Sequence, residues 1–253
     1  MPRRPSPRVF ERLAQAYRDR PGYPDELSAR LLALAPERPR VVDLGAGTGH
    51  LAGPQARGGA RVVAVEPARA MLDVCAERVR GLEVTLVQAP AEATGLAAGS
   101  ADLVVLADAV QWVDPDAAGR EAHRLLGEDG AAAAVEARSA ATPFMLGLDA
   151  LLREANPRRR PGRPGRARQW LGLASGGAPV ESSELLHSVP LTARELEAVL
   201  RSLSFLGPAL GPRQMEALVG RALELAARHG GARWDRVLVL SWARRRAVRR
   251  GGR

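Results

Sequence analysis

Lysine is absent from this chain of 253 residues, so all 37 of its basic side chains are arginines. The formal net charge of +9 is of the kind that nucleic-acid-binding proteins carry. Fifteen of the arginines, however, lie in three segments without acids, residues 1–9, 156–168 and 244–253, which leaves 22 arginines against 28 acidic residues elsewhere. The body of the protein is therefore acidic. The arginine-only composition indicates GC-rich coding rather than selection for phosphate contacts.

Cysteine and long apolar runs are also scarce. The single cysteine, Cys75, excludes an intramolecular disulfide, and we expect it to pack on a helix. No segment reaches the roughly 18 apolar residues of a membrane span. The first ten residues, MPRRPSPRVF, lack the apolar stretch of a secretory signal. These absences predict a protein of the reducing cytoplasm without a membrane partner.

A glycine-rich turn organises the chain. Residues 41–51, VVDLGAGTGHL, combine a buried-strand pattern with Gly45, Gly47 and Gly49, and an aspartate, Asp43, stands two residues before the first glycine. The third glycine comes one residue earlier than in the G-x-G-x-x-G pattern of dinucleotide-binding proteins. We interpret the segment as a strand and a cofactor-binding turn whose amides face the ligand.

The next strand supports a nucleoside ligand. Residues 61–67, RVVAVEP, end in Glu66, at about the spacing at which doubly wound folds place a carboxylate over a ribose diol. A carboxylate accepts hydrogen bonds from both hydroxyls and would repel a 2′-phosphate. The two segments together predict a site for an unphosphorylated nucleoside.

The order D-L-G-A-G-T-G resembles the first motif of class I S-adenosylmethionine-dependent methyltransferases. The resemblance implies that Asp43 holds the methionine ammonium and that the glycines pass beneath the nucleoside. Residues 17–24, YRDRPGYP, resemble the Y-x-x-x-R-P-x-Y-P segment of trans-aconitate and related small-molecule methyltransferases. By that resemblance Tyr17 and Arg20 belong to the cofactor site, with Arg20 on the methionine carboxylate. A proline-terminated turn with a surface arginine is the alternative.

The adenine side is implied by two further matches. Met71, on a helix expected over residues 68–80, corresponds to a family position that packs against adenine, although core packing explains it equally well. Residues 88–96, QAPAEATGL, match the family at Ala91 and Glu92, while Pro90 replaces a hydrogen-bonding side chain. Adenine would then rest on backbone groups such as the Ala91 amide.

Residues 100–114, SADLVVLADAVQWVD, match the family's fourth strand and the loop after it. Asp108 lies at the topological switch point, where open α/β sheets bind ligands, so we expect it in the cofactor site, and it is also the best-placed catalytic base. Tyr23 is the second catalytic candidate, and both Tyr17 and Tyr23 could orient a substrate. Gln111 stands where many relatives have histidine, so it can orient a substrate but cannot take its proton, and Trp112 either walls the substrate side or is structural.

The histidines of the sequence give no sign of a catalytic or metal-binding role. His50 opens the helix after the glycine turn, and His123 and His187 look structural. We expect no metal site.

The resemblance implies one α/β domain over residues 1–253, with a doubly wound, Rossmann-like sheet of seven strands. The order would be 3-2-1-4-5-7-6, the last strand antiparallel, with helices on both faces and a small helical lid. Residues 1–35 form an N-terminal cap, 36–140 the cofactor-binding core, and 141–253 the lid and closing strands. Further helices are expected over 9–17, 25–35 with Asp25 as cap, 115–126, 143–155, after Thr192, and 212–229. A turn at GEDG (127–130), strands over 83–87, 131–137, 184–189 and 236–242, a disordered start and a mobile loop over 156–168 complete the expectation.

The expected function is methylation of a small metabolite or an intermediate of bacterial secondary metabolism, with S-adenosylmethionine as cofactor and an oligomeric state left open. The alternative is non-methylation chemistry on the same sulfonium, such as cyclisation to azetidine-2-carboxylate with release of methylthioadenosine. RNA methylation is disfavoured, because the fourth strand continues A-D-A-V instead of N-P-P-Y and Cys75 lies away from the site. A cofactor-binding protein without catalysis is a further alternative.

Overall fold

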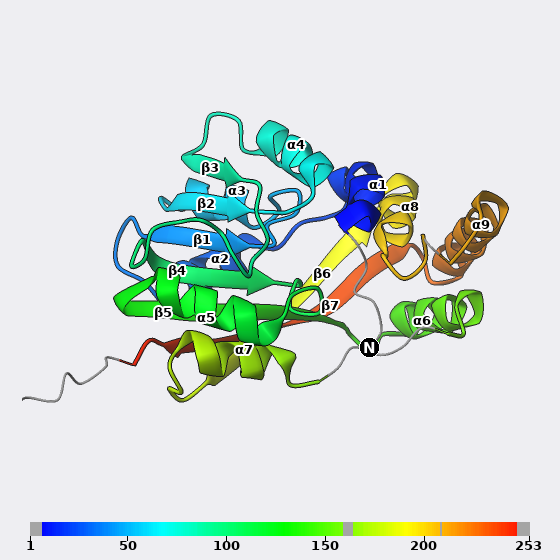
Figure 1. Cartoon of the computed structure of the whole chain (residues 1–253). Coiled ribbons are helices and arrows are strands. Elements are labelled where there is room, and N and C mark those ends of the chain that lie inside the picture. The colour runs from blue at the N-terminus through cyan, green and yellow to red at the C-terminus, as the bar shows by residue number, and fades with distance from the viewer. Residues whose placement is uncertain (1–6, 159–163, 208, 247–253) are drawn as a thin grey trace, which may run out of the picture. The chain divides into compact units, whose positions relative to one another are not determined.

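A computed structural model describes residues 7–158, 164–207 and 209–246. Within them one seven-stranded sheet has the order β3-β2-β1-β4-β5-β7-β6, with flanking helices (Figure 1). The strands are β1 (Arg40–Leu44), β2 (Arg61–Val65), β3 (Val84–Val87), β4 (Ala101–Ala107), β5 (Leu126–Ser139), β6 (Glu181–Leu191) and β7 (Ala232–Arg244). The predicted strand order and antiparallel closing strands are confirmed.

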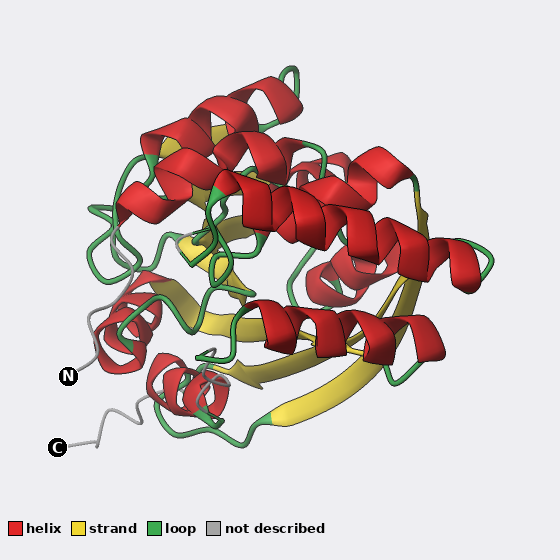
Figure 2. Cartoon of the chain, turned by 90° about the vertical axis from the view of Figure 1, so that its right-hand side faces the viewer, coloured by secondary structure: helices red, strands yellow, loops and turns green. Residues whose placement is uncertain are grey.

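The helices of the described residues are α1 (Pro7–Arg18), α2 (Asp25–Leu32), α3 (Ala52–Arg57), α4 (Arg69–Arg78), α5 (Pro115–Leu125), α6 (Pro143–Ala155), α7 (Arg166–Ala174), α8 (Ala193–Ser202) and α9 (Pro212–Arg228). Figure 2 colours helices and strands differently, so that the flanking helices can be followed against the sheet. The chain divides into two compact units. We call residues 23–136, 163–183 and 239–253 the core unit, and residues 1–22, 137–162 and 184–238 the cap unit.

In the core unit, β1 lies between β2 and β4, and all three run parallel. Asp43 is level with Ala64 on β2 and with Val105 on β4, so the strands end together at their carboxyl ends. Most of their valines, leucines and alanines are buried, as expected for parallel strands with both faces covered. This register brings the segments that follow β1, β2 and β4 to one edge of the sheet.

Helices α5 and α7 pack closely against each other in the core unit. Asp114 caps α5 by accepting from the amides of Asp116 and Ala117. A side chain at Gly119 would meet the Cβ of Leu173 at 2.7 Å and the carbonyl oxygen of Trp170 at 3.0 Å, so only glycine allows this approach. Trp170 is fully buried there.

The cap unit has its own apolar core. In it α1 packs on α8, α6 on α9, and α8 on α9. Residues from these helices and from the strand ends are buried together, among them Phe144, Leu196, Leu218 and Trp234. Thr192 caps α8 through a reciprocal capping box with Glu195, which confirms the predicted helix start.

Several local expectations are wrong. Part of the loop expected over residues 156–168 lies outside the described residues, but α7 begins inside it at Arg166, after Gly165 in a left-handed conformation (φ 81°). The GEDG segment lies within β5, where the register against β4 shifts, instead of forming a turn before the strand. Pro24, not Asp25, occupies the cap position of α2.

The helix after the glycine turn also starts later than expected. Residues 47–51 form turns and α3 begins at Ala52, so His50 precedes the helix. Its Nδ1 lies 2.8 Å from the hydroxyl of Thr48. The expected disordered start, residues 1–6, and the arginines after residue 246 lie outside the described residues. Among the residues described, no helix is long and apolar enough to cross a membrane.

Candidate cofactor-binding site

The backbone of the glycine turn is tied to β2. The amides of Gly45 and Ala46 both donate to the carbonyl oxygen of Val65, at 2.8 and 3.0 Å. The amide of Gly47 donates to a carboxylate oxygen of Glu66 at 3.1 Å. The expectation that these amides face a ligand is therefore wrong. They hold the turn against the neighbouring strand.

The three glycines of the turn have different surroundings, although all have positive φ. A side chain at Gly45 would come within 2.8 Å of the Ala109 side chain, and one at Gly49 within 2.7 Å of the Cys75 sulfur. One at Gly47 would meet no atom within 4 Å. The first and third glycines thus permit close packing within the protein, whereas Gly47 borders open space that a ligand can fill.

Glu66 is buried and fixed by the backbone. One of its carboxylate oxygens accepts from Gly47 N, and the other accepts from Ala68 N at 2.9 Å. A carboxylate oxygen has two lone pairs, so a group of this kind can accept hydrogen bonds from more than one donor at each oxygen. This geometry matches the role predicted for a residue that binds a diol.

Asp43 is the most unusual group of the site. It is only 1% exposed, and within the described residues its Oδ2 atom has no hydrogen-bond partner. Burial, and to a lesser extent the nearby charge of Glu66, raise the pKa of Asp43 to about 7. A buried carboxylate without a partner is costly unless a cation or donor completes it. The arrangement therefore suits a cationic group bound beside the turn.

Cys75 lies on α4 next to Gly49 of the turn, and its side chain is a protonated thiol. It is buried, as predicted, and burial is the main reason that its pKa is raised to about 12. Arg78 of the same helix donates to the carbonyl oxygen of Thr48 at 2.9 Å. Helix α4 thus supports the turn through both packing and a hydrogen bond.

Asp108 directly follows β4 in a left-handed backbone conformation (φ 48°). Such strain in a residue other than glycine persists only where the surroundings enforce it, which is frequent at functional sites. Here the Asp108 amide donates to Val135 O at 2.8 Å, and the Tyr23 hydroxyl donates to Asp108 Oδ2 at 2.9 Å. The structure therefore brings together the two residues predicted to be catalytic.

The turn after Asp108 carries the two predicted substrate residues. Gln111 is exposed, and its Nε2 donates to the carbonyl oxygen of Asp108 at 2.7 Å. Trp112 is half-buried, and its amide donates to Ala109 O. Arg166, which sequence reasoning left in a loop, donates from Nε to Val110 O at 3.1 Å and from Nη2 to Val113 O. Nothing in the arginine-rich segment distinguishes Arg166 from its neighbours.

The three residues predicted to surround the adenine differ in burial and in their contacts. Met71 is 1% exposed on α4 and Ala91 is 4% exposed. A Glu92 carboxylate oxygen accepts from the Asp114 amide at 2.7 Å, so Glu92 holds the loop that leads into α5. The predicted contacts of Met71, Ala91 and Glu92 with a cofactor stay predictions.

Tyr17 and Arg20 belong to the cap unit. The Arg20 guanidinium carbon lies 5.2 Å from the centroid of the Tyr17 ring and 4.8 Å from that of Trp234. Arg236 stacks on Trp234 as well, at 3.7 Å. Its guanidinium also contacts the Gly22 carbonyl oxygen at 2.9 Å and His187 Nδ1 at 2.8 Å. Burial, aided by the Arg236 charge, lowers the pKa of His187 to about 4, so the imidazole is a neutral acceptor.

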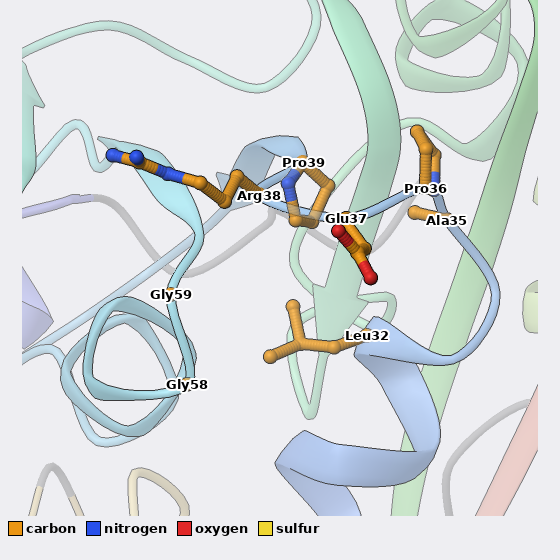
Figure 3. Close-up of a pocket in the computed structure, with 8 residues that line it drawn as sticks. All are labelled: Leu32, Ala35, Pro36, Glu37, Arg38, Pro39, Gly58 and Gly59. Atoms are coloured by element: carbon orange, nitrogen blue, oxygen red, sulfur yellow. The ribbon is translucent and has the colours of Figure 1, made fainter.

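A shallow pocket lies elsewhere in the core unit (Figure 3). It has a volume of about 360 Å³ and is lined by Leu32, Ala35, Pro36, Glu37, Arg38, Pro39, Gly58 and Gly59. Residues 35–39 precede β1, so this pocket adjoins the amino end of the strand, while the glycine turn follows its carboxyl end. It is separate from the candidate site, and of the predicted site residues it contains none. Across the described residues no group of His, Cys, Asp or Glu is placed to hold a metal ion.

Comparisons with known proteins agree with this geometry. Residues 42–134 match the family described as "Methyltransferase domain". Uncharacterized methyltransferases of Mycobacterium bovis and Mycobacterium tuberculosis are each 42% identical over 109 residues, which cover 43% of this chain and 43% of theirs. The chain thus matches a little under half the length of these curated relatives.

Solved structures extend the likeness over most of the chain. A protein from Anaeromyxobacter dehalogenans, provisionally described as a type II methyltransferase, is 25% identical with a TM-score of 0.55 over 89% of this chain and 96% of its own. The [4+2]-cyclase SpnF shares the fold at 20% identity, with a TM-score of 0.54 over 88% of this chain and 82% of its own. These comparisons confirm the resemblance to class I S-adenosylmethionine-dependent methyltransferases, with the sequence match to the methyltransferase-domain family over residues 42–134, and the trans-aconitate-like subgroup stays a prediction.

Proposed function

We propose that this protein is an S-adenosylmethionine-dependent methyltransferase that acts on a small metabolite or biosynthetic intermediate. The observation that carries the proposal is the buried Asp43 carboxylate, whose unpartnered oxygen belongs to the end of β1, directly before the turn with the open space at Gly47. A cofactor with an ammonium group and an uncharged ribose fits both features. The charge excess of the three arginine-rich segments leaves an acidic body, which disfavours RNA as the substrate.

The residues of the core unit divide the cofactor among them in this proposal. Asp43 holds the ammonium, Glu66 accepts from the ribose hydroxyls, and the backbone at Gly47 lies beneath the nucleoside. Met71, Ala91 and Glu92 surround the adenine. In the cap unit, Arg20 stacks on Tyr17 and Trp234, which restricts its side chain, and the predicted role of Arg20 at the methionine carboxylate stays a prediction.

The cofactor supplies a methyl group activated by a positively charged sulfur. The protein must align the acceptor with that carbon and exclude water. Asp108 is the base that takes the acceptor's proton when the acceptor is a hydroxyl. Tyr23, which donates to Asp108 Oδ2, fixes the orientation of the carboxylate for this step.

Gln111 can hydrogen-bond the methyl acceptor but cannot take its proton. The atom 2.7 Å from the Asp108 carbonyl oxygen must be the amide nitrogen, because two oxygens would repel each other there. The amide nitrogen has a second N–H, and the amide oxygen is an acceptor. Gln111 can therefore offer a substrate both a donor and an acceptor.

The experiment that tests the function identifies the nucleoside product. Purified protein is incubated with S-adenosylmethionine, with and without a metabolite extract, and the nucleosides are identified by mass spectrometry. We expect S-adenosylhomocysteine that depends on the extract. Catalytic accumulation of methylthioadenosine without extract would instead establish the cyclisation alternative, and tight binding without turnover would establish a non-catalytic binder.

Substitution ties the function to the site. Asp43→Ala and Glu66→Ala should each weaken S-adenosylmethionine binding by roughly 1–3 kcal/mol in titration calorimetry, because each leaves donors on the ligand without partners. Glu37→Ala, in the separate pocket, is the matched control and should bind normally. Unchanged affinity in both site variants would contradict the assignment.

The fold alone does not decide between methyl transfer and other chemistry, since a cyclase shares it. Asp43 does favour methyl transfer. Cyclisation needs the α-amine unprotonated and free to attack its own γ-carbon, whereas a carboxylate in Asp43's position holds that amine as an ammonium. We place the enzyme in the cytoplasm and in small-molecule biosynthesis, in line with its single buried cysteine.

A further inference from the structure

The segment from Ala109 to Val113 is a short turn that follows β4 and Asp108. The Trp112 amide donates to Ala109 O at 2.9 Å, and the Gln111 side chain donates to Asp108 O. The carbonyl groups of Val110 and Val113, at the two ends of the segment that contains Gln111 and Trp112, point to one guanidinium group, that of Arg166.

Arg166 comes from a firmly held element. It is the first residue of α7, which packs on α5 through the close approach at Gly119 and through the fully buried Trp170. Gln169 of the same helix donates to Asp116 Oδ1 at 2.7 Å. The arginine therefore connects a rigid helix pair to a turn more than fifty residues earlier in the chain.

A guanidinium group is suited to this task because its donors stand in a fixed fork and its charge is permanent. Two carbonyl oxygens bound to one fork cannot move independently. Lysine at this position would offer a single ammonium without the planar fork. The contact therefore fixes the spacing of the two carbonyl groups, and with it the direction of the side chains between them.

We propose that Arg166 is a positioning residue, which clamps the turn of residues 109–113 and so holds Gln111 and Trp112 in place for the methyl acceptor. The inference rests on the proposed function, because it concerns the substrate side of that site. It assigns to the arginine-rich segment a role in the reaction that does not involve phosphate. Arg166 itself contacts the backbone of the turn and acts through it.

The test uses the whole protein labelled with 5-fluorotryptophan. The chain has four tryptophans, so Trp112 and Trp170 can be assigned in the fluorine NMR spectrum by Trp112→Phe and Trp170→Phe. We expect Arg166→Gln to broaden or split the Trp112 resonance and to leave the Trp170 resonance unchanged. Trp170 lies on α7 itself, so it reports any general loosening of that helix.

Arg168→Gln is the matched control, because Arg168 is an exposed arginine on the same helix and its loss changes the charge equally. It should leave both resonances unchanged. Arg166→Lys, which keeps the charge, should give an intermediate Trp112 spectrum and replaces the glutamine variant if that one does not fold. An unchanged Trp112 resonance, or a Trp170 resonance that changes as much as that of Trp112, would overturn the proposal.

Cofactor binding separates this inference from the proposed function. Arg166→Gln should bind S-adenosylmethionine within about twofold of the unmodified protein, since the clamp shares no partner with Asp43 or Glu66. The NMR readout needs neither cofactor nor acceptor. Failure of the unmodified protein to bind S-adenosylmethionine would refute the proposed function. A Trp112 resonance that does not change in Arg166→Gln would refute only the positioning role of Arg166.

Discussion

The two units of the chain each bury a charged side chain, but they treat the charge in opposite ways. In the core unit, Asp43 is 1% exposed and its Oδ2 has no partner within the described residues. In the cap unit, Arg236 is 4% exposed, stacks on Trp234 and contacts both the Gly22 carbonyl oxygen and His187 Nδ1. Burial alone therefore does not distinguish a binding residue from a structural one.

The difference lies in the contacts that the structure gives each group: the Arg236 guanidinium meets two hydrogen-bond acceptors and the Trp234 ring, whereas Asp43 Oδ2 has no partner within the described residues. A buried ion that supplies hydrogen bonds to its neighbours stabilises a particular packing, and its removal leaves those neighbours unpaired. A buried carboxylate oxygen that meets no donor or cation stays costly until something else completes it. By this reasoning Arg236 holds the cap unit together, whereas Asp43 lowers the stability of the empty protein in return for affinity.

A large loss of stability should come from removing the Arg236 guanidinium. Arg236→Met leaves the Gly22 carbonyl oxygen and His187 without their donor and should destabilise the protein by about 3 kcal/mol in chemical denaturation. Arg233→Met, on the same strand but with a largely exposed side chain, should cost less than about 0.5 kcal/mol. Equal costs for the two variants would remove the contrast between the units.

Asp43→Asn should have the opposite effect on stability. Burial raises the pKa of Asp43 to about 7, so the folded protein binds its proton more tightly than the unfolded chain does. The stability that this provides is complete below about pH 4 and is lost as the pH rises through 7. At pH 8, Asp43→Asn should therefore stabilise the empty protein by roughly 2–4 kcal/mol, and at pH 4 by almost nothing.

The same substitution should weaken S-adenosylmethionine binding by about tenfold or more, because the amide carries no charge for the ammonium. Asp73→Asn, exposed on α4, is the control and should change neither property. Thermal unfolding at pH 4 and pH 8 and calorimetry at pH 8 measure the two effects. A variant that loses affinity and also stability at pH 8 would place Asp43 in the same class as Arg236.

Features that depend on neighbouring residues could be predicted from the sequence, whereas contacts between distant segments could not. Strand order could be predicted from the resemblance to a known family, and Asp43, Gly47 and Glu66 could be singled out from a local pattern of apolar runs and glycines. The contacts of Arg236 and Arg166 could not, since each joins segments far apart in the chain, and one arginine among many carries no local signal. Helix α7 was missed because three prolines and several arginines precede it, while its buried face becomes apparent only against Gly119.

The smallest predicted effect compares two glycines of one turn. Gly47 and Gly49 both have positive φ, at 55° and 78°, so alanine should cost each about 1 kcal/mol of backbone strain. Only at Gly49 would the added methyl group meet another atom, the Cys75 sulfur at 2.7 Å. Gly49→Ala should therefore be the less stable variant by roughly 1 kcal/mol or more. Combining Cys75→Ala with Gly49→Ala should recover the stability that the contact with the sulfur costs, and Cys75→Ala should give no such recovery with Gly47→Ala. A double-mutant cycle measures both effects.

The affinities of the two glycine variants for S-adenosylmethionine should show the reverse order. Gly47→Ala should weaken binding more than the combined Gly49→Ala and Cys75→Ala variant, because only the methyl group at position 47 would enter the ligand's space. If Gly47→Ala binds the cofactor normally, the open space above this glycine is not where the nucleoside lies.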